Sequence, residues 1–360
     1  MSPVSNQLPL NDLHRSAGAR LREFSGWLVP ADYGDMAAEH RAVMTGAGVI
    51  DRSMLGKATV TGRDRAAFLQ GMLSNDVKAL QPGQGCPAAF LDAVGKVVSL
   101  LVAYALSDRI LLELPAGSTE KFLQAIDKFL ISEKAEFESS DDAYAILSLQ
   151  GPKAGEVLAR ASGTALDLAP YAHAEVEVGG AAVRVTRRAE AVTPGFHCWV
   201  APENAPALWK AFREGGAVPV GADASETLRL EAGIPAYGAD VDEGVILPET
   251  RLEALVSYTK GCYIGQETVA RVKYRGHINR GLSGLVLDGE TVPSPGDPIF
   301  AEDKDIGRVT SAVRSIALGR PIALGYIRRE HFETGSAVSV KSADRLVSGH
   351  VSDLPFVKPA

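Results

Sequence analysis

The spacing of hydrophobic and polar residues changes several times along the 360-residue chain, and each change marks an expected structural element. Apolar residues recur at helical spacing from His14 to Phe24 and again from Asp35 to Thr45, which predicts two helices. The stretch between them, S-G-W-L-V-P-A-D-Y-G, contains glycine and proline and predicts a loop. From Gly48 onwards, short apolar stretches predict strands that alternate with helices.

Residues 48–140 and 141–222 each show strands interrupted by helices. In the first part, A-A-F-L-D-A-V-G-K-V-V-S-L-L-V-A-Y-A-L predicts a hairpin that turns at Ala93–Lys96, and S-T-E-K-F-L-Q-A-I-D-K-F-L predicts an amphipathic helix. The second part repeats the pattern, with strands A-Y-A-I-L-S-L-Q and F-H-C-W-V-A and a helix after each. No G-x-G-x-x-G follows a strand and no Walker loop is present. The pattern predicts two helix-on-antiparallel-sheet (ferredoxin-like) domains of the α+β class.

Helical spacing nearly disappears after Arg280. G-L-S-G-L-V-L-D-G, G-R-V-T-S-A-V, I-A-L-G-Y-I and R-L-V-S-G-H-V read as short strands at turn spacing. They predict a small all-β barrel at the C-terminal end of the chain.

Composition places the chain among globular proteins, because 46% of its residues are hydrophobic and 22% are charged. The net charge of −7 argues against nucleic-acid binding over the whole surface. The start of the chain lacks a signal-peptide pattern, and the longest apolar run, Val97–Leu106, is too short to span a membrane. Three widely spaced cysteines give no disulfide or zinc pattern, and the seven histidines lack metal-binding spacing. We expect a cytoplasmic protein without a metal site.

The octapeptide K-G-C-Y-I-G-Q-E, from Lys260 to Glu267, contains one of the three cysteines between two glycines. The residues after Gly265 predict the first turn of a helix, so Cys262 would lie just before a helix N-terminus and beside Lys260. Both features lower the pKa of a thiol. The alternative interpretation is that Cys262 is a small buried hydrophobic side chain.

Two other segments contain charges in a suggestive pattern. Arg229 and Glu231 alternate with apolar residues in T-L-R-L-E-A-G, and a surface ion pair worth ~0–1 kcal/mol is the simplest alternative explanation. If they lie on a strand, Arg271, Lys273 and Arg275 would share one face. They would then form a basic strip that suits binding of carboxylates or phosphates. The alternative for these three is an edge strand guarded by charge.

The longer segment K-G-C-Y-I-G-Q-E-T-V-A-R-V-K-Y-R-G closely resembles the signature of the YgfZ-type folate-binding proteins, which serve iron–sulfur cluster assembly or repair. That family belongs to the glycine-cleavage T-protein (aminomethyltransferase) superfamily. G-W-L-V-P-A-D-Y-G, G-V-I-D-R-S-M-L-G-K, L-R-L-E-A-G-I-P-A-Y-G-A-D-V-D-E and G-R-V-T-S-A-V resemble further superfamily segments, in the same order.

The resemblance implies a three-domain cloverleaf around a central channel that holds tetrahydrofolate or a one-carbon-substituted folate. One domain would join residues 1–47 with residues 141–278, the second would span residues 48–140, and the barrel would span residues 279–360. Folate would be the small-molecule partner, and neither a membrane nor a nucleic acid is expected.

The resemblance also implies site residues. Glu231 matches a glutamate expected to bind the amino-pyrimidine edge of the pterin, as a carboxylate can, and Lys260 and Cys262 match the lysine and cysteine of the family motif. From their charge, we expect Arg271 and Arg275 to meet the glutamate tail. The full set of expected folate contacts is Asp92, Arg229, Glu231, Tyr237, Lys260, Arg271 and Arg275.

One departure separates the chain from true aminomethyltransferases, which have an acidic pair in the pattern G-x-x-x-D-D after the hairpin. Here the stretch is G-K-V-V-S-L, and Ser99 and Leu100 supply no carboxylate, so general acid–base help worth ~100- to 10,000-fold is missing. Two other segments favour the transferase instead. They resemble it more than they resemble some YgfZ-type proteins, and they read L-R-L-E-A-G and Y-G-A-D-V-D-E.

Three hypotheses follow. The first is a folate-binding accessory protein for iron–sulfur cluster assembly or repair, with Cys262 as a reactive thiol and iron–sulfur proteins as clients. The second is an enzyme, either a folate-dependent aminomethyltransferase or a related one-carbon transferase. The third is a scaffold that keeps the fold without the ligand.

Overall fold

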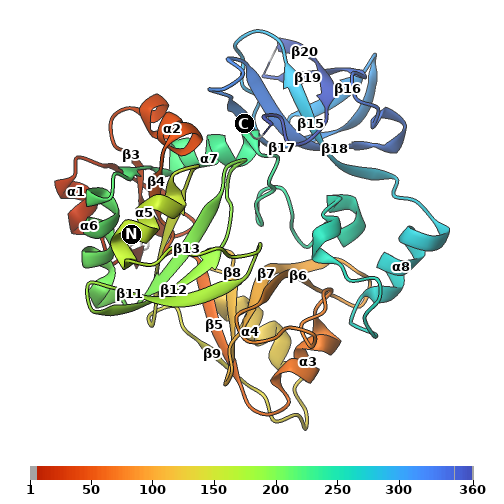
Figure 1. Ribbon diagram of the computed structural model, residues 1–360. Helices are drawn as coiled ribbons and strands as arrows, with labels where there is room; N and C mark the ends of the chain where they lie inside the picture. The colour runs from red at the N-terminus through yellow and green to blue at the C-terminus, as the bar shows by residue number, and fades with distance from the viewer. Residues whose placement is uncertain (1–5, 344, 359–360) are drawn as a thin grey trace, which may run out of the picture.

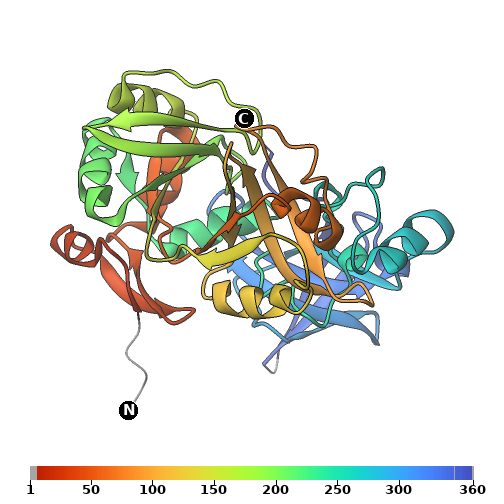
Figure 2. The same ribbon diagram turned by 90° about the horizontal axis from the view of Figure 1, so that it is seen from below.

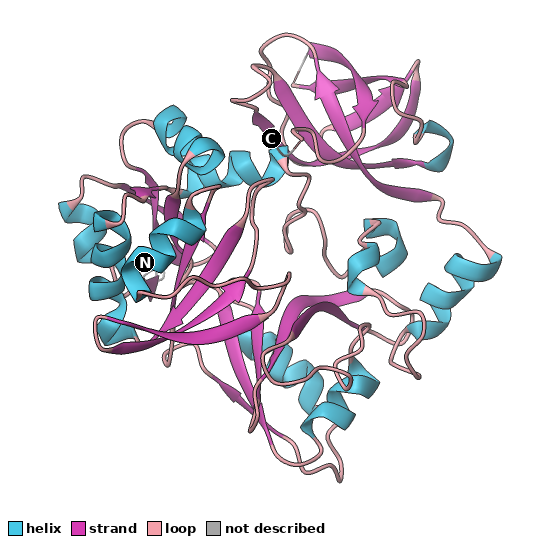
Figure 3. Cartoon of the chain, viewed as in Figure 1, coloured by secondary structure: helices cyan, strands magenta, loops and turns pink. Residues whose placement is uncertain are grey.

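Three lobes surround the centre of the molecule in the computed structural model, which describes residues 6–343 and 345–358 (Figures 1 and 3). Two lobes are open sheets covered by helices, and the third is a closed barrel. The predicted α+β cloverleaf with a C-terminal barrel is confirmed. Within the described part of the chain, no helix is long and apolar enough to cross a bilayer.

The first lobe is a six-stranded sheet in the order β11-β12-β13-β10-β4-β14. All its pairings are antiparallel except that of β14 with β4. Helices α5 and α6 cover one face and bury a core that includes Leu147, Cys198 and Phe212. The strands are β4 (Gly48–Asp51), β10 (Ala145–Gln150), β11 (His173–Val178), β12 (Ala181–Arg187), β13 (Gly195–Val200) and β14 (Val218–Pro219); the helices are α5 (Ala154–Ser162) and α6 (Ala205–Glu214), preceded by η1 (Pro202–Asn204).

The pairing of strand β4 places the boundary between the first and second domains later than expected. The expected boundary between residues 47 and 48 assigned this strand to the second domain, but it pairs with β10 and β14 of the first sheet. The boundary therefore follows Asp51. A short apolar strand such as G-V-I-D fits either sheet, and only tertiary pairing decides between them.

The N-terminal segment forms α1 (Asn11–Ser16) and a small sheet in the order β1-β3-β2, seen at the edge of the molecule in Figure 2. The predicted helix from His14 to Phe24 is wrong after Ser16. Gly18 has a φ of +82°, which helices do not adopt, and Arg20–Phe24 (β2) pairs with Trp27–Asp32 (β3). Strand β1 spans Asn6–Gln7. The predicted helix from Asp35 to Thr45 is confirmed as α2 (Met36–Thr45), which packs against α7 (Ala222–Glu231).

The second lobe is an antiparallel sheet in the order β6-β7-β8-β5-β9, with α3 and α4 on one face. The predicted hairpin is confirmed, with Gly95 in its turn at a φ of +87°. The strands are β5 (Gly56–Thr61), β6 (Gly85–Leu91), β7 (Val97–Ala105), β8 (Ile110–Leu114) and β9 (Glu136–Ser139); the helices are α3 (Arg65–Met72) and α4 (Thr119–Asp127).

The third lobe is a six-stranded barrel in which β15 pairs with both β18 and β20 and so closes the ring. Its interior is aliphatic and includes Leu285, Ile299, Val309 and Val340. The strands are β15 (Arg280–Leu287), β16 (Pro298–Ala301), β17 (Lys304–Arg314), β18 (Pro321–Arg328), β19 (Ala337–Ser342) and β20 (Arg345–Ser352), with η4 (Arg329–His331) after β18.

A segment of residues 232–279 connects α7 to the barrel and packs on the second sheet. It contains η2 (Leu247–Thr250), η3 (Glu253–Leu255) and α8 (Gln266–Arg275), and α8 projects to one side of the molecule in Figure 1. The predicted strand through Arg271, Lys273 and Arg275 is wrong, because these residues lie in α8. Residues two apart on a helix are about 200° apart, so only Arg271 and Arg275 share a face.

Candidate functional site

The first and second sheets face each other across a group of polar side chains, which we call the inter-sheet cluster. Glu113 on β8 comes from the second sheet, Arg52 directly follows β4, and Ser225 lies on α7. The other members come from the first lobe. Together they form one connected set of hydrogen bonds and ion pairs. The members are Arg52, Glu113, Ser148, Gln150, Arg188, Glu190, His197 and Ser225.

Strand alternation explains why polar groups gather between the sheets. Successive side chains of a strand point to opposite faces. On β10 and β13, Leu147 and Cys198 lie in the helix-covered core of the first lobe, so their neighbours Ser148 and His197 face the second sheet. Ser148 and His197 are also directly paired across the two strands.

His197 lies between two carboxylates. Its Nδ1 atom is 2.9 Å from Glu113 Oε2, and its Nε2 atom is 3.3 Å from Glu190 Oε1. Arg52 Nε donates to Glu190 at 3.0 Å, and Ser148 Oγ donates to the same carboxylate at 2.8 Å. Arg188 Nε reaches Glu113 at 3.3 Å. Each buried charge therefore has an opposite charge beside it.

The mutual contacts set the charge states of the cluster. Burial opposes ionisation of His197, but Glu113 and Glu190 outweigh it and raise the pKa of the imidazole to about 9. Burial likewise opposes ionisation of Glu190, yet Arg52 and His197 hold its pKa well below the usual value. The pKa of Glu113 is also lowered, by His197 and Arg188 against burial. At neutral pH the cluster holds an imidazolium, two guanidinium groups and two carboxylates.

One side of the cluster is open. The side chains of Arg52, Glu190 and Arg188 keep 15%, 19% and 29% of their surface exposed, whereas His197 keeps 1%. Within the cluster, the buried His197 Nε2 atom makes no hydrogen bond among the described residues, and its 3.3 Å separation from Glu190 Oε1 is an ion-pair distance. An unsatisfied buried polar atom next to partly exposed charges is the arrangement expected where a polar ligand binds.

The structure places Glu231 away from this cluster. Its Oε2 accepts from His40 Nε2 at 2.6 Å, and its Oε1 accepts from Ser315 Oγ at 2.6 Å and Ala317 N at 3.0 Å. The residue is 1% exposed. These bonds connect α7 to α2 and to the barrel, and burial leaves the carboxylate almost no surface for a ligand. Glu231 is thus explained as an interdomain contact, and a pterin contact there receives no support from the geometry.

Arg229 and Tyr237 also make contacts within the protein. Arg229 forms an ion pair with Asp240 at 2.8 Å, pairs with Glu226 and donates to Ser311 of the barrel. The hydroxyl of the half-buried Tyr237 donates to the carbonyl of Val98 on β7. Both residues fix the segment after α7 against neighbouring lobes.

Lys260 caps the end of helix α3. Its Nζ atom donates to the carbonyls of Gln70 at 2.6 Å and Asn75 at 3.1 Å, and to that of Leu73. These are the carbonyls that a helix C-terminus leaves without partners and that a cation satisfies well. Burial lowers the pKa of Lys260 to about 8. The lysine of the octapeptide therefore has a structural explanation.

The rest of the octapeptide packs on the hairpin of the second sheet. Gly265 has a φ of +81° and lies so close to Asp92 and Gly95 that a Cβ atom would be 2.6 Å from the Asp92 carbonyl. The Asp92 carboxylate accepts from the backbone N–H groups of Val94 and Lys96 and so shapes the turn. Gly265 therefore needs no ligand to explain it, whereas a Cβ atom at Gly261 would meet nothing within 4 Å.

Neither Ser99, Asp92 nor Glu231 lines the two described cavities of the molecule. Ser99 is buried in β7 opposite Phe90, and Leu100 packs with Leu91 and Val97 against the segment after α7. The missing acidic pair is thus replaced by a buried hydroxyl and an apolar contact. Arg271 and Arg275 are exposed on α8.

Cys262 is the exposed cysteine of the three, and its accessibility predicts selective labelling. Cys198 is buried, and burial raises the pKa of the half-buried Cys86 to about 12. We expect one thiol per chain to react with a maleimide at pH 7 under native conditions and three after unfolding. Mass spectrometry of the labelled peptides checks this, with Cys262→Ser as the control that should remove the fast reaction. Rapid labelling of Cys198 would contradict the described packing.

Sequence reasoning missed the inter-sheet cluster. Glu113 and His197 each interrupt an otherwise apolar strand, I-L-L-E-L and G-F-H-C-W-V. A charged residue at a core position of a strand is rarely buried without a partner, and that rule could have identified both. Their 84-residue separation concealed the fact that they pair with each other.

Comparison with known proteins agrees with this architecture. Residues 10–260 match the family model described as the GCVT N-terminal domain, and residues 280–358 match the glycine cleavage T-protein C-terminal barrel domain. The chain is 32% identical over 355 residues to an aminomethyltransferase of Halothermothrix orenii, covering 97% of this chain and 99% of that protein. It is 34% identical over 356 residues to an aminomethyltransferase of Rubrobacter xylanophilus, covering 97% and 94%. The crystal structure of the glycine cleavage system aminomethyltransferase T from Bartonella henselae superposes with a TM-score of 0.91 at 26% identity, covering 99% of both chains.

Proposed function

Because this chain belongs to the glycine-cleavage T-protein family, we propose that it binds tetrahydrofolate and transfers a one-carbon unit to it from an aminomethyl donor. The prediction of a folate cofactor is confirmed at the level of the family, whose aminomethyltransferases use tetrahydrofolate as the one-carbon acceptor.

The predicted accessory role in iron–sulfur cluster assembly or repair is wrong. Relatives that are 32–34% identical over nearly the whole chain are named aminomethyltransferase, which favours the enzyme hypothesis. The same finding removes the support for an assignment to the YgfZ-type branch and for iron–sulfur client proteins. The octapeptide that suggested this branch is largely explained by its packing on the second sheet.

The inter-sheet cluster is the observation that supports the proposal at the level of residues. A reduced pterin presents a planar edge of hydrogen-bond donors and acceptors, and the cluster offers both kinds of partner on its open side. Glu190 is the cluster carboxylate that keeps exposed surface, and we propose that it accepts from an amino-pyrimidine edge beside its ion-pair partner Arg52. We infer that the folate binds against these groups.

The atoms of the proposed transfer reaction balance without any further reactant. An S-aminomethyl thioether and tetrahydrofolate give the free thiol, ammonia and methylene-tetrahydrofolate. The folate, when bound, supplies the two nitrogen atoms that accept the methylene carbon. The leaving amine needs a proton, and Ser99 and Leu100 hold none of suitable pKa.

The protein's own contribution in this arrangement is the fixed charge of the inter-sheet cluster. His197 is an imidazolium at neutral pH, since its pKa is raised to about 9 against the cost of burial by Glu113 and Glu190. Its Nε2 atom lies 3.3 Å from Glu190, whose carboxylate is partly exposed on the open side. His197 is itself 1% exposed, so it acts by positioning and charging Glu190 rather than by touching a substrate.

An assay with purified protein tests the proposal. Tetrahydrofolate and an S-aminomethyl dihydrolipoyl group, carried on its protein or supplied as the amide, are expected to yield methylene-tetrahydrofolate and ammonia in equal amounts. Coupling to a methylene-tetrahydrofolate dehydrogenase measures the first product. Calorimetric binding of tetrahydrofolate without either product would contradict the transfer reaction, and the absence of any heat of binding would favour the scaffold hypothesis.

A further inference from the structure

Arg188 belongs to the inter-sheet cluster, but the proposed function gives it no ligand. The residue directly follows β12, and its backbone is fixed on both sides. Its N–H donates to the carbonyl of Gly195 on β13 at 2.9 Å, and its own carbonyl accepts from Gln150 Nε2 on β10 at 2.9 Å. Two strands of the first sheet therefore determine where the side chain of Arg188 begins.

The guanidinium of Arg188 is held on one edge and one face. Its Nε atom reaches Glu113 Oε1 at 3.3 Å, and its central carbon lies 5.7 Å from the centre of the Tyr171 ring. The two Nη atoms make no hydrogen bond within residues 6–343 and 345–358, and 29% of the side chain is exposed. The edge formed by the two Nη atoms is one that binds a carboxylate through paired hydrogen bonds.

The charges of the inter-sheet cluster do not cancel. At neutral pH it holds three positive charges, on Arg52, Arg188 and His197, and two negative charges, on Glu113 and Glu190. One positive charge is therefore left over in a group that is mostly buried. Uncompensated charge in such a place is costly. A ligand group with a single negative charge would balance the cluster.

A folate bound at Glu190 cannot supply that negative charge. Arg188 and Glu190 lie on either side of the Glu113–His197 pair, each at 3.3 Å from it. The two residues thus belong to one small group. When the pterin edge binds Glu190, the carboxylates of the same folate molecule are separated from it by the rigid aminobenzoyl ring. The anionic group at Arg188 therefore belongs to the second substrate, which is the one-carbon donor.

We propose that Arg188 binds a carboxylate of the one-carbon donor and so selects a free mercapto acid over the corresponding amide. This inference rests on the proposed function. The donor would be the S-aminomethyl thioether of the acid. Its carbon–sulfur and carbon–amine bonds break, and the methylene carbon forms two bonds to folate nitrogen atoms. The two protons released by these nitrogen atoms go to the thiol and to ammonia, so no oxidant is needed.

The test runs the reaction in reverse, with ammonia, methylene-tetrahydrofolate and a thiol. Mercaptopropionate and dihydrolipoate are each compared with their amide, and release of tetrahydrofolate is measured. We expect kcat/KM for the acid to exceed that for the amide by about 10- to 100-fold in at least one pair, the effect of one hydrogen-bonded charge. In Arg188→Gln this ratio should fall to about one. Because both rates of a ratio come from the same variant, a general loss of activity cancels.

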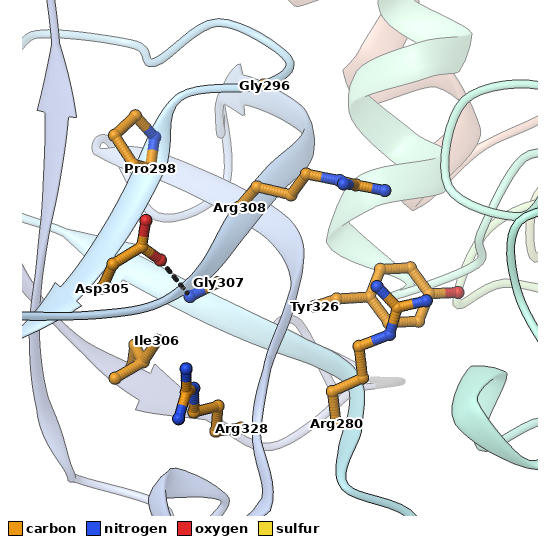
Figure 4. A pocket seen from close by; sticks show the side chains of 9 residues that line it. All are labelled: Arg280, Gly296, Pro298, Asp305, Ile306, Gly307, Arg308, Tyr326 and Arg328. Carbon is orange, nitrogen blue, oxygen red and sulfur yellow. Dashed lines mark hydrogen bonds between the residues drawn. The ribbon is translucent and has the colours of Figure 1, made fainter.

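The matched control is Arg308→Gln, which should keep the wild-type ratio. Arg308 is an exposed arginine that lines a cavity on the barrel (Figure 4), so the substitution removes the same charge outside the cluster. If thermal melting shows that Arg188→Gln is unfolded, Arg188→Lys replaces it. Lysine keeps the charge but lacks the paired Nη edge, so we expect the ratio to fall at least about threefold.

Each other result has a defined meaning. Equal kcat/KM for acid and amide in both wild-type pairs, or a ratio that is unchanged in the Arg188 variant, would overturn the role of Arg188 and leave the proposed function standing. If no thiol releases tetrahydrofolate, the proposed function fails instead, and calorimetry with the same acids and amides then tests Arg188 directly. Binding of an acid that is lost in the Arg188 variant supports the carboxylate site, and equal binding of acid and amide overturns it.

Discussion

Replacing His197 with alanine is expected to lower the free energy of unfolding at pH 7 by about 3–5 kcal/mol, the range for removing one partner of a buried ion pair. The substitution leaves Glu113 and Glu190 buried without the imidazolium between them. Arg52 and Arg188 remain but contact only one carboxylate each. Urea denaturation of the purified variant measures the change.

The same residue predicts a pH dependence. The ordinary pKa of histidine, 6.5, rises to about 9 in the folded protein, so the stabilisation by His197 is fully present below pH 6.5 and is lost as the pH rises through 9. This change amounts to about 3 kcal/mol. Because the pKa values of Glu113 and Glu190 are lowered, their contribution is lost only as the pH falls below their ordinary value of 4.5.

A matched control separates the buried histidine from histidines in general. His331, partly exposed in η4, should change the free energy of unfolding by less than about 0.5 kcal/mol when replaced by alanine. A loss below 1 kcal/mol for His197→Ala, or a flat stability between pH 6.5 and 9 in the wild type, would show that the cluster is not charged as described.

Glu190→Gln is expected to weaken binding of tetrahydrofolate by roughly 10- to 100-fold, the loss of one charge-assisted interaction. Glu190 is the partly exposed carboxylate of the inter-sheet cluster and the acceptor proposed for the amino-pyrimidine edge. Glutamine keeps the size of the side chain but presents one oxygen and no charge. Isothermal titration calorimetry with monoglutamyl tetrahydrofolate measures the effect.

The control for this prediction is Glu156→Gln, which removes a carboxylate from an exposed ion pair with Arg160 on α5 and should leave folate affinity unchanged. The measurement is made well below the melting temperature of both variants, so that loss of the buried Arg52 contact is not mistaken for loss of ligand binding. An unchanged dissociation constant for Glu190→Gln would remove Glu190 from the binding site.

Local pattern predicted much of the fold because the elements in question are strongly periodic. The hairpin at Ala93–Lys96, the helix from Asp35 to Thr45 and the C-terminal barrel follow from alternation, helical spacing and turn residues. The failures arose where a tertiary partner decides the conformation. Arg20–Phe24 has helical spacing but pairs with β3.

The candidate site was harder to predict for a different reason. Charged residues in the octapeptide and in L-R-L-E-A-G were prominent in the sequence, yet Lys260, Arg229 and Glu231 connect parts of the fold. Glu113 and His197 were inconspicuous, since each is a single polar residue in an apolar strand, and Glu190 lies in the loop before β13. Their meaning depends on three-dimensional proximity, which one sequence without relatives does not reveal.

The closure of the barrel limits how another protein can attach to it. Strand β15 pairs on both sides, with β18 and β20, so the described barrel strands form a ring and offer no open rim of backbone N–H and C=O groups. A carrier that delivers the aminomethyl group could not dock there by extending the sheet with a strand of its own. Recognition on this lobe has to come from side chains rather than from backbone hydrogen bonds.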